Sequence, residues 1–501
     1  MKKLIAIAAA IVLVAIAGWS GLWFAGRGAV ADRIDREIAQ LEAQGFEVNH
    51  GSREIGGFPF AYKVTHRDVT VMEPTGGSVY RLPEVTSEVT AADTDKLVSR
   101  FPAKFSLDVP LDEAQRASWP GMPEILTFDV ESTDLVVISD GVPGKGQEFA
   151  ITAKSLLLVT GSAEQPLNFA VEFTVLDSTG ILPALSSGLP ATSATTIERL
   201  DYAYSTSAPH GIAVNIVASI DNLRVTGTSD ARDQAAMQAL LAGTGTYSMA
   251  YQTGASQGVV RAGAGPEQQE GSLKFEAGST AGTVSLANGI FEIATASQAN
   301  RLTVTTGPEI PGGKPFGGEM RAVEMHVSGP FAPSDTMAPS AFRFALDQIV
   351  PDEALWKLID AGGKLPHDPA RLTIELDGTA RITGDLMQHR PGEAPPFEFG
   401  NVSIKSTDID ALGAGVTTRG DIAFTQPLNQ PMGTVTVTLN KAEELMLNLA
   451  AAGLLDPITV QTVMMMAPGF TTPGAEPGEL VSRIELNADR ISVNGQLIGG
   501  N

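Results

Sequence analysis

The feature that most constrains the fold of this 501-residue chain is a hydrophobic period of two residues, which persists over several hundred positions. Alternation of apolar and polar residues is typical of β-strands that bury one face. Clear segments of this kind are residues 46–50, 60–72, 126–130, 151–159, 169–176, 212–217, 320–327, 372–376, 435–439 and 484–486. They recur with no regular helix between them, so the sequence predicts antiparallel sheet rather than a βαβ enzyme core.

The predicted fold class is therefore mainly β, with extended, curved antiparallel sheets and a few short helices after one N-terminal transmembrane helix. The 52 glycines and 31 prolines, with few aromatic residues, agree with many strands joined by turns. Helices are predicted at residues 230–241, 351–360 and 442–452. The last of them is rich in Leu and Met, so we expect it to pack across a sheet or to cover an apolar cavity.

The N-terminus carries an uncharged stretch of 23 residues, 4–26, directly after Lys2 and Lys3. At about 1.5 Å per residue a helix of this length can span about 30 Å of hydrocarbon. The two lysines predict a cytoplasmic start, so residues 1–26 are expected to be a single-pass inner-membrane anchor with the bulk of the chain in the periplasm. The alternative is a signal peptide cleaved near residues 29–31, although the apolar core exceeds the usual length.

The rest of the chain is expected to fall into three parts. Residues 27–45 form an amphipathic stalk helix that ends at Gly45, because Ile34, Ile38 and Leu41 recur at helical spacing. Residues 178–196 and 306–318 are rich in Ser, Gly and Pro, and are therefore predicted to be loops. A boundary at the second loop gives a first β-rich region, residues 46–310, and a second, residues 311–501.

One motif invites an enzymatic interpretation, the run Gly-Ala-Ser-Gln-Gly at residues 254–258. It matches the nucleophile elbow of serine hydrolases, which would make Ser256 the nucleophile. That elbow requires a strand before the serine and a helix after it, whereas residues 258–263 continue as strand or loop. A tight turn is therefore the preferred interpretation, and we expect no catalytic residue and no enzyme.

The remaining compositional signals exclude several other functions. The six histidines are scattered without the i, i+4 spacing of zinc enzymes, and no metal site or cofactor is predicted. The net charge of −23 opposes binding to nucleic acid, and no phosphate-binding loop supports a nucleotide. The chain has no cysteine, which removes disulfides and thiol chemistry and is compatible with a periplasm.

Two stretches resemble known envelope proteins. Residues 56–64, Gly-Gly-Phe-Pro-Phe-Ala-Tyr-Lys-Val, together with 67–71, resemble the segment that follows the anchor in AsmA-like envelope proteins. Residues 415–422, 433–437, 445 and 452–455 resemble a block of an uncharacterised family of alphaproteobacterial membrane-anchored envelope proteins. The resemblance implies a β-rich periplasmic protein held at the inner membrane and linked to lipid traffic or outer-membrane assembly. It transfers no catalytic residue.

These signals favour a non-enzymatic, inner-membrane-anchored periplasmic protein that binds an apolar, lipid-like ligand or an envelope-assembly partner. An amphipathic sheet offers an apolar surface for acyl chains without any special residue type, so a motif search would miss it. The alternatives are a purely structural or protein-binding envelope scaffold and, third, a serine hydrolase that uses Ser256.

Overall fold

The computed structural model describes residues 26–500 with internal gaps. The gaps are residues 37, 40, 44, 59, 75–76, 91–92, 112, 114–115, 117–122, 143–145, 161–166, 185–186, 208–212, 232–233, 264–270, 306–313, 385–395, 426–429 and 488–489. Apart from Gly26, the predicted anchor lies outside the described residues. Within the described part, none of the helices combines the length and the apolar character needed to cross a bilayer.

The described chain is mainly β and antiparallel, as the alternation predicts, and each alternating segment overlaps an observed strand. Two compact units can be distinguished. Unit 1 comprises Met1–Thr226 and Ala262–Pro266, and unit 2 comprises Gly227–Arg261 and Glu267–Asn501. A boundary was expected between residues 310 and 311. The strands on either side of it, Ile290–Thr305 and Phe316–Pro330, both lie in unit 2 and pair with each other.

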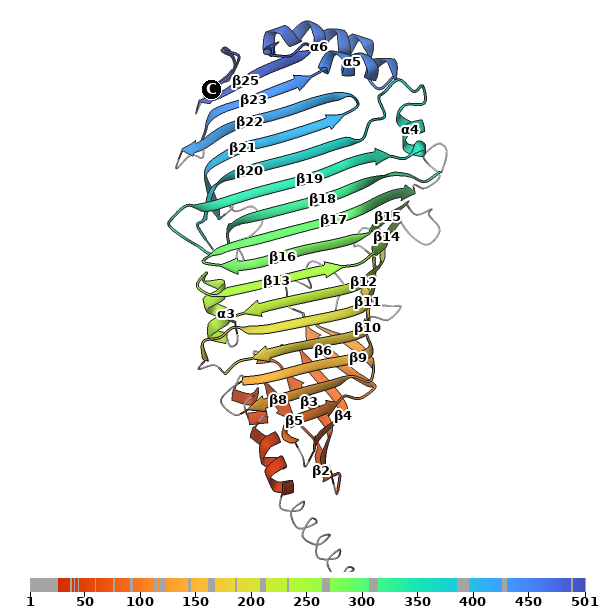
Figure 1. Ribbon diagram of the computed structural model, residues 1–501, viewed down its shortest axis with the longest axis vertical. Coiled ribbons are helices and arrows are strands. Elements are labelled where there is room, and N and C mark those ends of the chain that lie inside the picture. Colours follow the sequence, from red (N-terminus) through yellow and green to blue (C-terminus); the bar gives the residue numbers. More distant parts are fainter. Residues whose placement is uncertain are drawn as a thin grey trace, which may run out of the picture. The chain divides into compact units, whose positions relative to one another are not determined.

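Unit 1 is an antiparallel sheet whose strands pair with strands near them along the chain, although not always with the next one (Figure 1). Its strands are β1 (Glu47–Asn49), β2 (Ser52–Gly56), β3 (Ala61–Met72), β4 (Val79–Thr90), β5 (Asp93–Arg100), β6 (Lys104–Pro110), β7 (Ile125–Thr133), β8 (Val136–Val142), β9 (Gly146–Thr160), β10 (Leu167–Leu182), β11 (Ala191–Ser207) and β12 (Ala213–Ser229), which contains the point of division. Two pairs of these strands are halves of one interrupted strand. The strands β5 and β6 pair with successive parts of β4, and β8 and β7 pair with successive parts of β9.

A line of bends crosses these strands. Asp68 (φ 55°), Asp134 (φ 53°) and Val175 (φ 51°) adopt the left-handed conformation, which is uncommon for residues other than glycine. The β3–β4 register is the same on both sides of Asp68, so this residue marks a bend rather than an insertion. Buried positions in β3 are even-numbered before Asp68 and odd-numbered after it. The two-residue alternation therefore shifts by one position at the bend.

A helix precedes β1 and covers part of the sheet. Residues 26–36, 38–39 and 41–43 are helical, and Gly45 (φ 94°) ends the helix with the glycine C-cap that lets the chain turn away. The helix packs on β3, β4 and β5. The buried core formed there comprises Val30, Ile34, Tyr62, Val64, Val89 and Leu97. Val64 is 0% exposed, so this helix-covered patch is a packed core.

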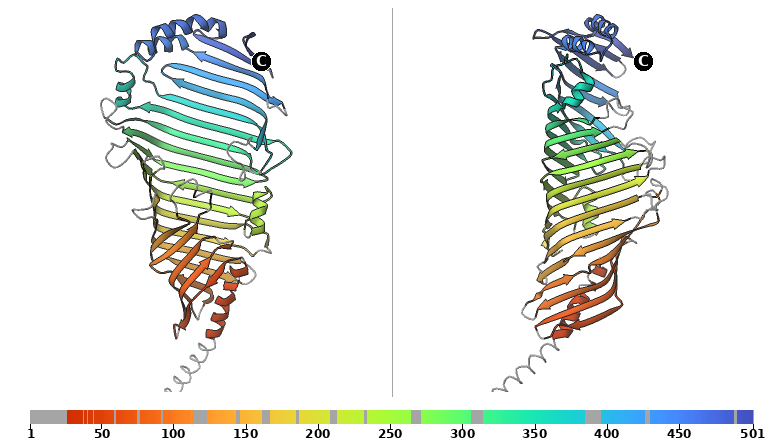
Figure 2. Two further views of the ribbon diagram at one scale, coloured as in Figure 1. Left: turned by 180° about the vertical axis from the view of Figure 1, so that it is seen from behind. Right: turned by 90° about the vertical axis from the view of Figure 1, so that its right-hand side faces the viewer.

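Unit 2 continues with the same antiparallel order: β16 to β23 pair in succession, and β25 then pairs with β23 (Figures 1 and 2). Its strands are β13 (Thr246–Thr253), β14 (Ser256–Gly263), β15 (Gly271–Ala277), β16 (Ser279–Ala287), β17 (Ile290–Thr305), β18 (Phe316–Pro330), β19 (Ala338–Pro351), β20 (Ala370–Ile382), β21 (Phe397–Ala411), β22 (Ala414–Thr425), β23 (Gln430–Asn440), β24 (Thr472–Pro473), β25 (Glu479–Asn487), β26 (Arg490–Val493) and β27 (Gln496–Gly500). Ala299, Arg321 and Gln348 are skipped in the ladders of β17, β18 and β19 and lie in line across them.

The helices of unit 2 match the sequence in three cases. The predicted segments contain α3 (Gln234–Leu241), α4 (Glu353–Ile359) and α5 (Ala442–Ala451). A further helix, α6 (Pro457–Phe470), was not predicted, because its β-branched residues and its internal Pro468 disfavour helix. Its start was nevertheless marked by Asp456, whose carboxylate accepts the N–H of Thr459 at 3.2 Å and caps the helix.

The loop predicted for residues 178–196 is wrong. Ser178 to Gly180 lie inside β10, and β11 begins at Ala191, so the connection between the two strands is much shorter. Gly180 is required by packing rather than by a turn, because a Cβ atom there would lie 2.3 Å from the ring of Phe149 on β9. Of the other predicted loop, residues 306–313 are not described, and Phe316 already belongs to β18.

Candidate functional site

The candidate site is one face of the sheet of unit 2, which alternation separates cleanly from the other face. Successive side chains of a strand point to opposite faces, and directly paired residues of neighbouring strands share a face. On β19 this places Phe342, Phe344 and Leu346 on one face, and Arg343 and Asp347 on the other. Following the registers of the neighbouring strands extends both sets across the unit.

We call the first set the apolar face of unit 2. Its large side chains, taken from β16 to β25, include Val284, Leu286, Phe291, Ile293, Val323, Met325, Val327, Phe342, Phe344, Leu346, Leu372, Ile374, Leu376, Val402, Ile404, Ile409, Val416, Ile422, Val435, Val437, Leu439, Leu480 and Ile484. None of the residues that the registers place between them on this face carries a charge. The polar members are a few Ser and Thr residues, with glycines at several positions.

The apolar face is incompletely covered by the described chain. Of these side chains Val435 is buried, Ile409 is exposed, and the others are half-buried; farther along β20 and β21 on the same face Ile382 is also buried, whereas Phe397 and Phe399 are exposed. By contrast, Val64 and Val89 of unit 1, which lie in the core beneath the N-terminal helix, are at most 1% exposed. A sheet face that served only as a packed core would show the second pattern. The apolar face therefore retains contact area for another apolar molecule.

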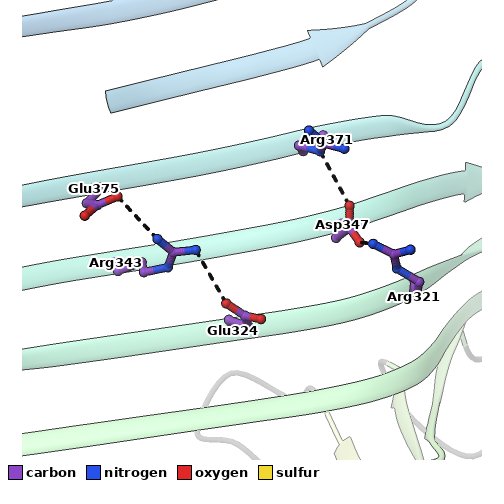
Figure 3. Close-up of polar contacts among 6 residues, drawn as sticks. All are labelled: Arg321, Glu324, Arg343, Asp347, Arg371 and Glu375. Carbon is purple, nitrogen blue, oxygen red and sulfur yellow. Dashed lines mark hydrogen bonds and ion pairs between the residues drawn. The ribbon is translucent and has the colours of Figure 1, made fainter. Parts of the chain in front are cut away.

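The opposite face is polar and is held together by ion pairs across strands (Figure 3). Arg343 on β19 lies between two carboxylates, 3.3 Å from Glu375 on β20 and 3.7 Å from Glu324 on β18. Asp347 pairs with Arg371 at 3.5 Å and also with Arg321. Apart from Asp347, whose side chain is 21% exposed, these side chains are largely exposed, so each pair contributes only about 0 to 1 kcal/mol. Their main consequence is that the two faces differ sharply in polarity.

On the apolar face the hydroxyl of Tyr251 has a hydrogen-bond partner, whereas the buried Oγ of Ser340 has none among the described residues. Tyr251 on β13 lies over Gly282 of β16, where a Cβ atom would be 2.6 Å from the tyrosine ring. Its hydroxyl is 2.8 Å from the Oγ1 of Thr295 on β17. Gly282 thus leaves space for the aromatic ring of Tyr251 on the apolar face. Helix α5, which was expected to pack across a sheet or to cover an apolar cavity, contacts β22 and α6 and contains no buried residue.

Unit 1 carries a second apolar face on the strands β3 to β11. Registers place on it Val69, Val71, Tyr80, Leu82, Phe105, Leu107, Phe128, Val130, Leu156, Leu158, Phe169, Val171, Phe173, Leu200, Tyr202 and Tyr204. Phe169 makes edge-to-face contacts with Phe128 at 6.0 Å and with Tyr202 at 5.4 Å between ring centroids. These contacts join aromatic side chains of β7, β10 and β11, and most members of the face remain half-buried.

The structure places Ser256 at the start of β14, with β13 before it and Gly254 in the short interruption between them. A strand rather than a helix follows the serine, so the strand–turn–helix geometry of a nucleophile elbow is not formed. Among the described residues, none of the hydrogen bonds joins Ser256 to a histidine or a carboxylate.

Of the six histidines, His210 and His389 lie outside the described residues. The rings of His50 and His66 lie 4.9 Å apart. His367 stacks on Trp356 at 3.9 Å, and its Nε2 is 3.5 Å from the buried Asp360. No cluster of three or more metal-ligating side chains occurs in the described part of the chain.

Sequence reasoning identified the alternation but not the site itself. The two faces can be assigned from alternating residues only when two things are known: the registers of the strands, and the bends at which the alternation shifts by one position. The signal that could have been used is the separation of charge, because Arg343, Asp347 and Glu375 alternate with large apolar residues.

A family model described as "Uncharacterized protein conserved in bacteria (DUF2125)" matches residues 23–291, which is more than half of the chain. No curated protein and no solved structure matches the chain significantly.

Proposed function

The chain belongs to the family of uncharacterized proteins conserved in bacteria, DUF2125, and for this member we propose a non-enzymatic function, the binding of lipid acyl chains on the apolar face of unit 2. The ligand class is a molecule with long, uncharged hydrocarbon chains. The observation that carries the proposal is the combination of three properties in one face: large side chains, no charge and incomplete burial.

The dimensions of the face suit an acyl chain. It extends over nine strands from β16 to β25, and neighbouring strands are about 4.8 Å apart, so it measures about 38 Å across the strands. One leaflet of a bilayer has a hydrocarbon thickness of about 15 Å. Transfer of each methylene from water to such a surface contributes up to about 0.8 kcal/mol. A face of this size offers room for more than one chain without any directional polar contact.

The charge distribution favours the same ligand class. The net charge of −23 opposes anionic ligands at long range, and the charged residues near the site lie on the opposite face of the sheet. An acyl chain needs no counter-charge, so its binding is compatible with both properties. The absence of an elbow geometry at Ser256 supports binding rather than hydrolysis.

We propose further that residues 4–26 hold the protein in the inner membrane and that the two sheet units lie in the periplasm. The support is the uncharged 23-residue stretch after Lys2 and Lys3, together with the resemblance of residues 56–71 to AsmA-like envelope proteins. An anchored protein with an open apolar face would act at a membrane, where acyl chains are supplied. Envelope-assembly partners are the competing occupants of the same face.

The test compares two neighbouring residues of β23 that lie on opposite faces. Val437 is on the apolar face, whereas Thr436 is on the polar face, opposite Arg419 and Arg483. Val437→Asp introduces an unpaired charge on the proposed lipid surface, and Thr436→Asp places the same charge beside two arginines. The full-length protein and both variants are purified from their own envelope and analysed by native mass spectrometry with lipid extraction.

We expect bound lipid in the wild type and in Thr436→Asp, and at least about tenfold less in Val437→Asp, because a buried charge opposes apolar contact. Circular dichroism verifies that both variants are folded. Lipid-free wild-type protein, or equal lipid content in the two folded variants, would contradict the proposal and favour a protein-binding scaffold.

A further inference from the structure

Helix α6 presents an unusually apolar surface to solvent. Ile458 is 71% exposed and Met465 is 75% exposed, and Met466 next to it is also exposed. These residues lie on one side of the helix at a spacing of seven and eight positions, close to two turns. Val460 on the other side is buried and attaches the helix to the rest of unit 2. The exposed side has no partner among the described residues that would bury it.

The helix is fixed rather than loosely attached. Asp456 caps its N-terminus, and the carbonyl of Phe470 at its C-terminus accepts two hydrogen bonds. The donors are the hydroxyl of Ser482 at 2.6 Å and the side-chain amide of Asn494 at 2.9 Å. The C-terminal end is thus tied to Ser482 and Asn494 of unit 2, and the buried Val460 holds the body of the helix, so the apolar side is presented in one orientation.

The segment is also free of charge. From Pro457 to Ala475 no side chain is charged, although charged residues make up 18% of the chain. Helix α5 contacts α6 (Figure 1), and Leu447 of α5 and Leu454 just after it are also exposed. An apolar patch of this kind on a soluble surface marks a site of protein or membrane contact. The surface of α6 itself carries no charged side chain, and the nearest charges along the chain are Asp456 at its start and Glu476 beyond its end.

We propose that α6 is a membrane-interface helix, which inserts Ile458, Met465 and Met466 into a lipid surface. The helix has 14 residues and is about 21 Å long, which is too short to span a bilayer but sufficient to lie in its interface. Because α6 carries no cation and the whole chain is acidic, the matching surface is zwitterionic or uncharged rather than anionic. This contact is separate from the apolar face of the sheet and does not depend on ligand binding there.

The chain contains no cysteine, so a single introduced thiol can report on this contact. Met465→Cys is labelled with an environment-sensitive fluorophore in the full-length protein. The control is Leu189→Cys, which lies in the β10–β11 connection of unit 1 and is 60% exposed. Each labelled protein is reconstituted into phosphatidylcholine vesicles, with and without phosphatidylcholine that carries a nitroxide quencher on its acyl chain.

We expect about twofold or stronger quenching of the label at position 465 and none at position 189, because only an inserted side chain reaches the depth of the nitroxide. Adding Ile458→Glu to the Met465→Cys protein abolishes the quenching, whereas adding Leu189→Glu leaves it unchanged. Equal quenching at positions 465 and 189 would overturn the proposal. So would a label at 465 that is shielded before lipid is added, since that result indicates a protein partner or a second copy. Neither result affects the lipid content measured for Val437→Asp.

Discussion

Phe344 and Arg343 are adjacent in β19, yet they belong to opposite faces of the sheet. Arg343 joins Glu324 and Glu375 in an exposed row of charges, while Phe344 lies among half-buried apolar residues. One strand therefore separates a charged surface from an apolar one. The apolar side stays half-buried because no second layer of the described chain packs fully against it, in contrast to the helix-covered core of unit 1.

The first prediction concerns this pair. Arg343→Ala removes exposed ion pairs and should lower the free energy of unfolding by less than about 1 kcal/mol. Phe344→Ala should lower it by about 1 to 2 kcal/mol, which is less than the 3 to 5 kcal/mol typical of a fully buried Phe. Chemical denaturation of both variants provides the measurement. A loss of the full buried-residue size for Phe344→Ala would show that the apolar face is a packed core.

The second prediction concerns the helix that precedes β1. Ile34 is buried in the core with Val64, whereas Leu41 of the same helix is exposed. Ile34→Ala should therefore destabilise unit 1 by about 2 to 4 kcal/mol, through lost burial and an unfilled cavity. Leu41→Ala serves as the matched control, with an expected loss below about 0.5 kcal/mol. Similar losses for the two variants would contradict the packing of this helix on the sheet.

The third prediction concerns pH. Burial, reinforced by the nearby His50 and Arg53, lowers the pKa of His66 from 6.5 to about 4, and in the described chain no hydrogen bond satisfies its Nε2. The folded state keeps this imidazole neutral, whereas the unfolded chain takes up a proton below pH 6.5. Stability should therefore fall as the pH drops from about 6.5 to about 4, by at most about 3 kcal/mol.

Thermal unfolding of the wild type and of His66→Gln between pH 4.5 and 7.5 tests this dependence. The variant has no group that titrates at this position, so its midpoint should fall less steeply with acidity. Parallel pH profiles for the two proteins would assign the dependence to other groups.

The fourth prediction concerns the turn after α4. The buried carboxylate of Asp360 accepts the backbone N–H groups of Lys364 at 2.9 Å and Leu365 at 2.7 Å. These bonds, with a smaller contribution from His367, lower the pKa of Asp360. The stability they contribute is present above the ordinary pKa of an aspartate and is lost as the pH falls through the lowered value.

Asp360→Ala leaves both N–H groups without their acceptor and should lower the melting temperature of unit 2. Asp360→Asn keeps one acceptor oxygen and should have a smaller effect. Differential scanning calorimetry distinguishes the two. Equal melting temperatures for the wild type and Asp360→Ala would show that the turn does not depend on this carboxylate.

The local sequence patterns were sufficient to locate most of the strands and helices. Alternation located the strands, and apolar spacing located α4 and α5. Two errors have physical causes. The Ser- and Gly-rich end of β10 was interpreted as loop, yet Gly180 is there because the ring of Phe149 occupies the space of a Cβ atom. Helix α6 was missed because its low intrinsic propensity is overcome by the Asp456 cap and by tertiary contacts at Val460 and Phe470.

The alternation of apolar and polar residues was sufficient to predict antiparallel sheet with apolar residues on one side, because side-chain direction in a strand alternates with every residue. The residues that share a face could be assigned only from the folded chain, because left-handed residues such as Val175 and Ala299 interrupt the strands at bends. The tertiary structure also decided which apolar residues remain half-exposed, since burial depends on whether another element covers them. Val64 and Ile374 have similar local patterns, but only Val64 lies beneath a helix.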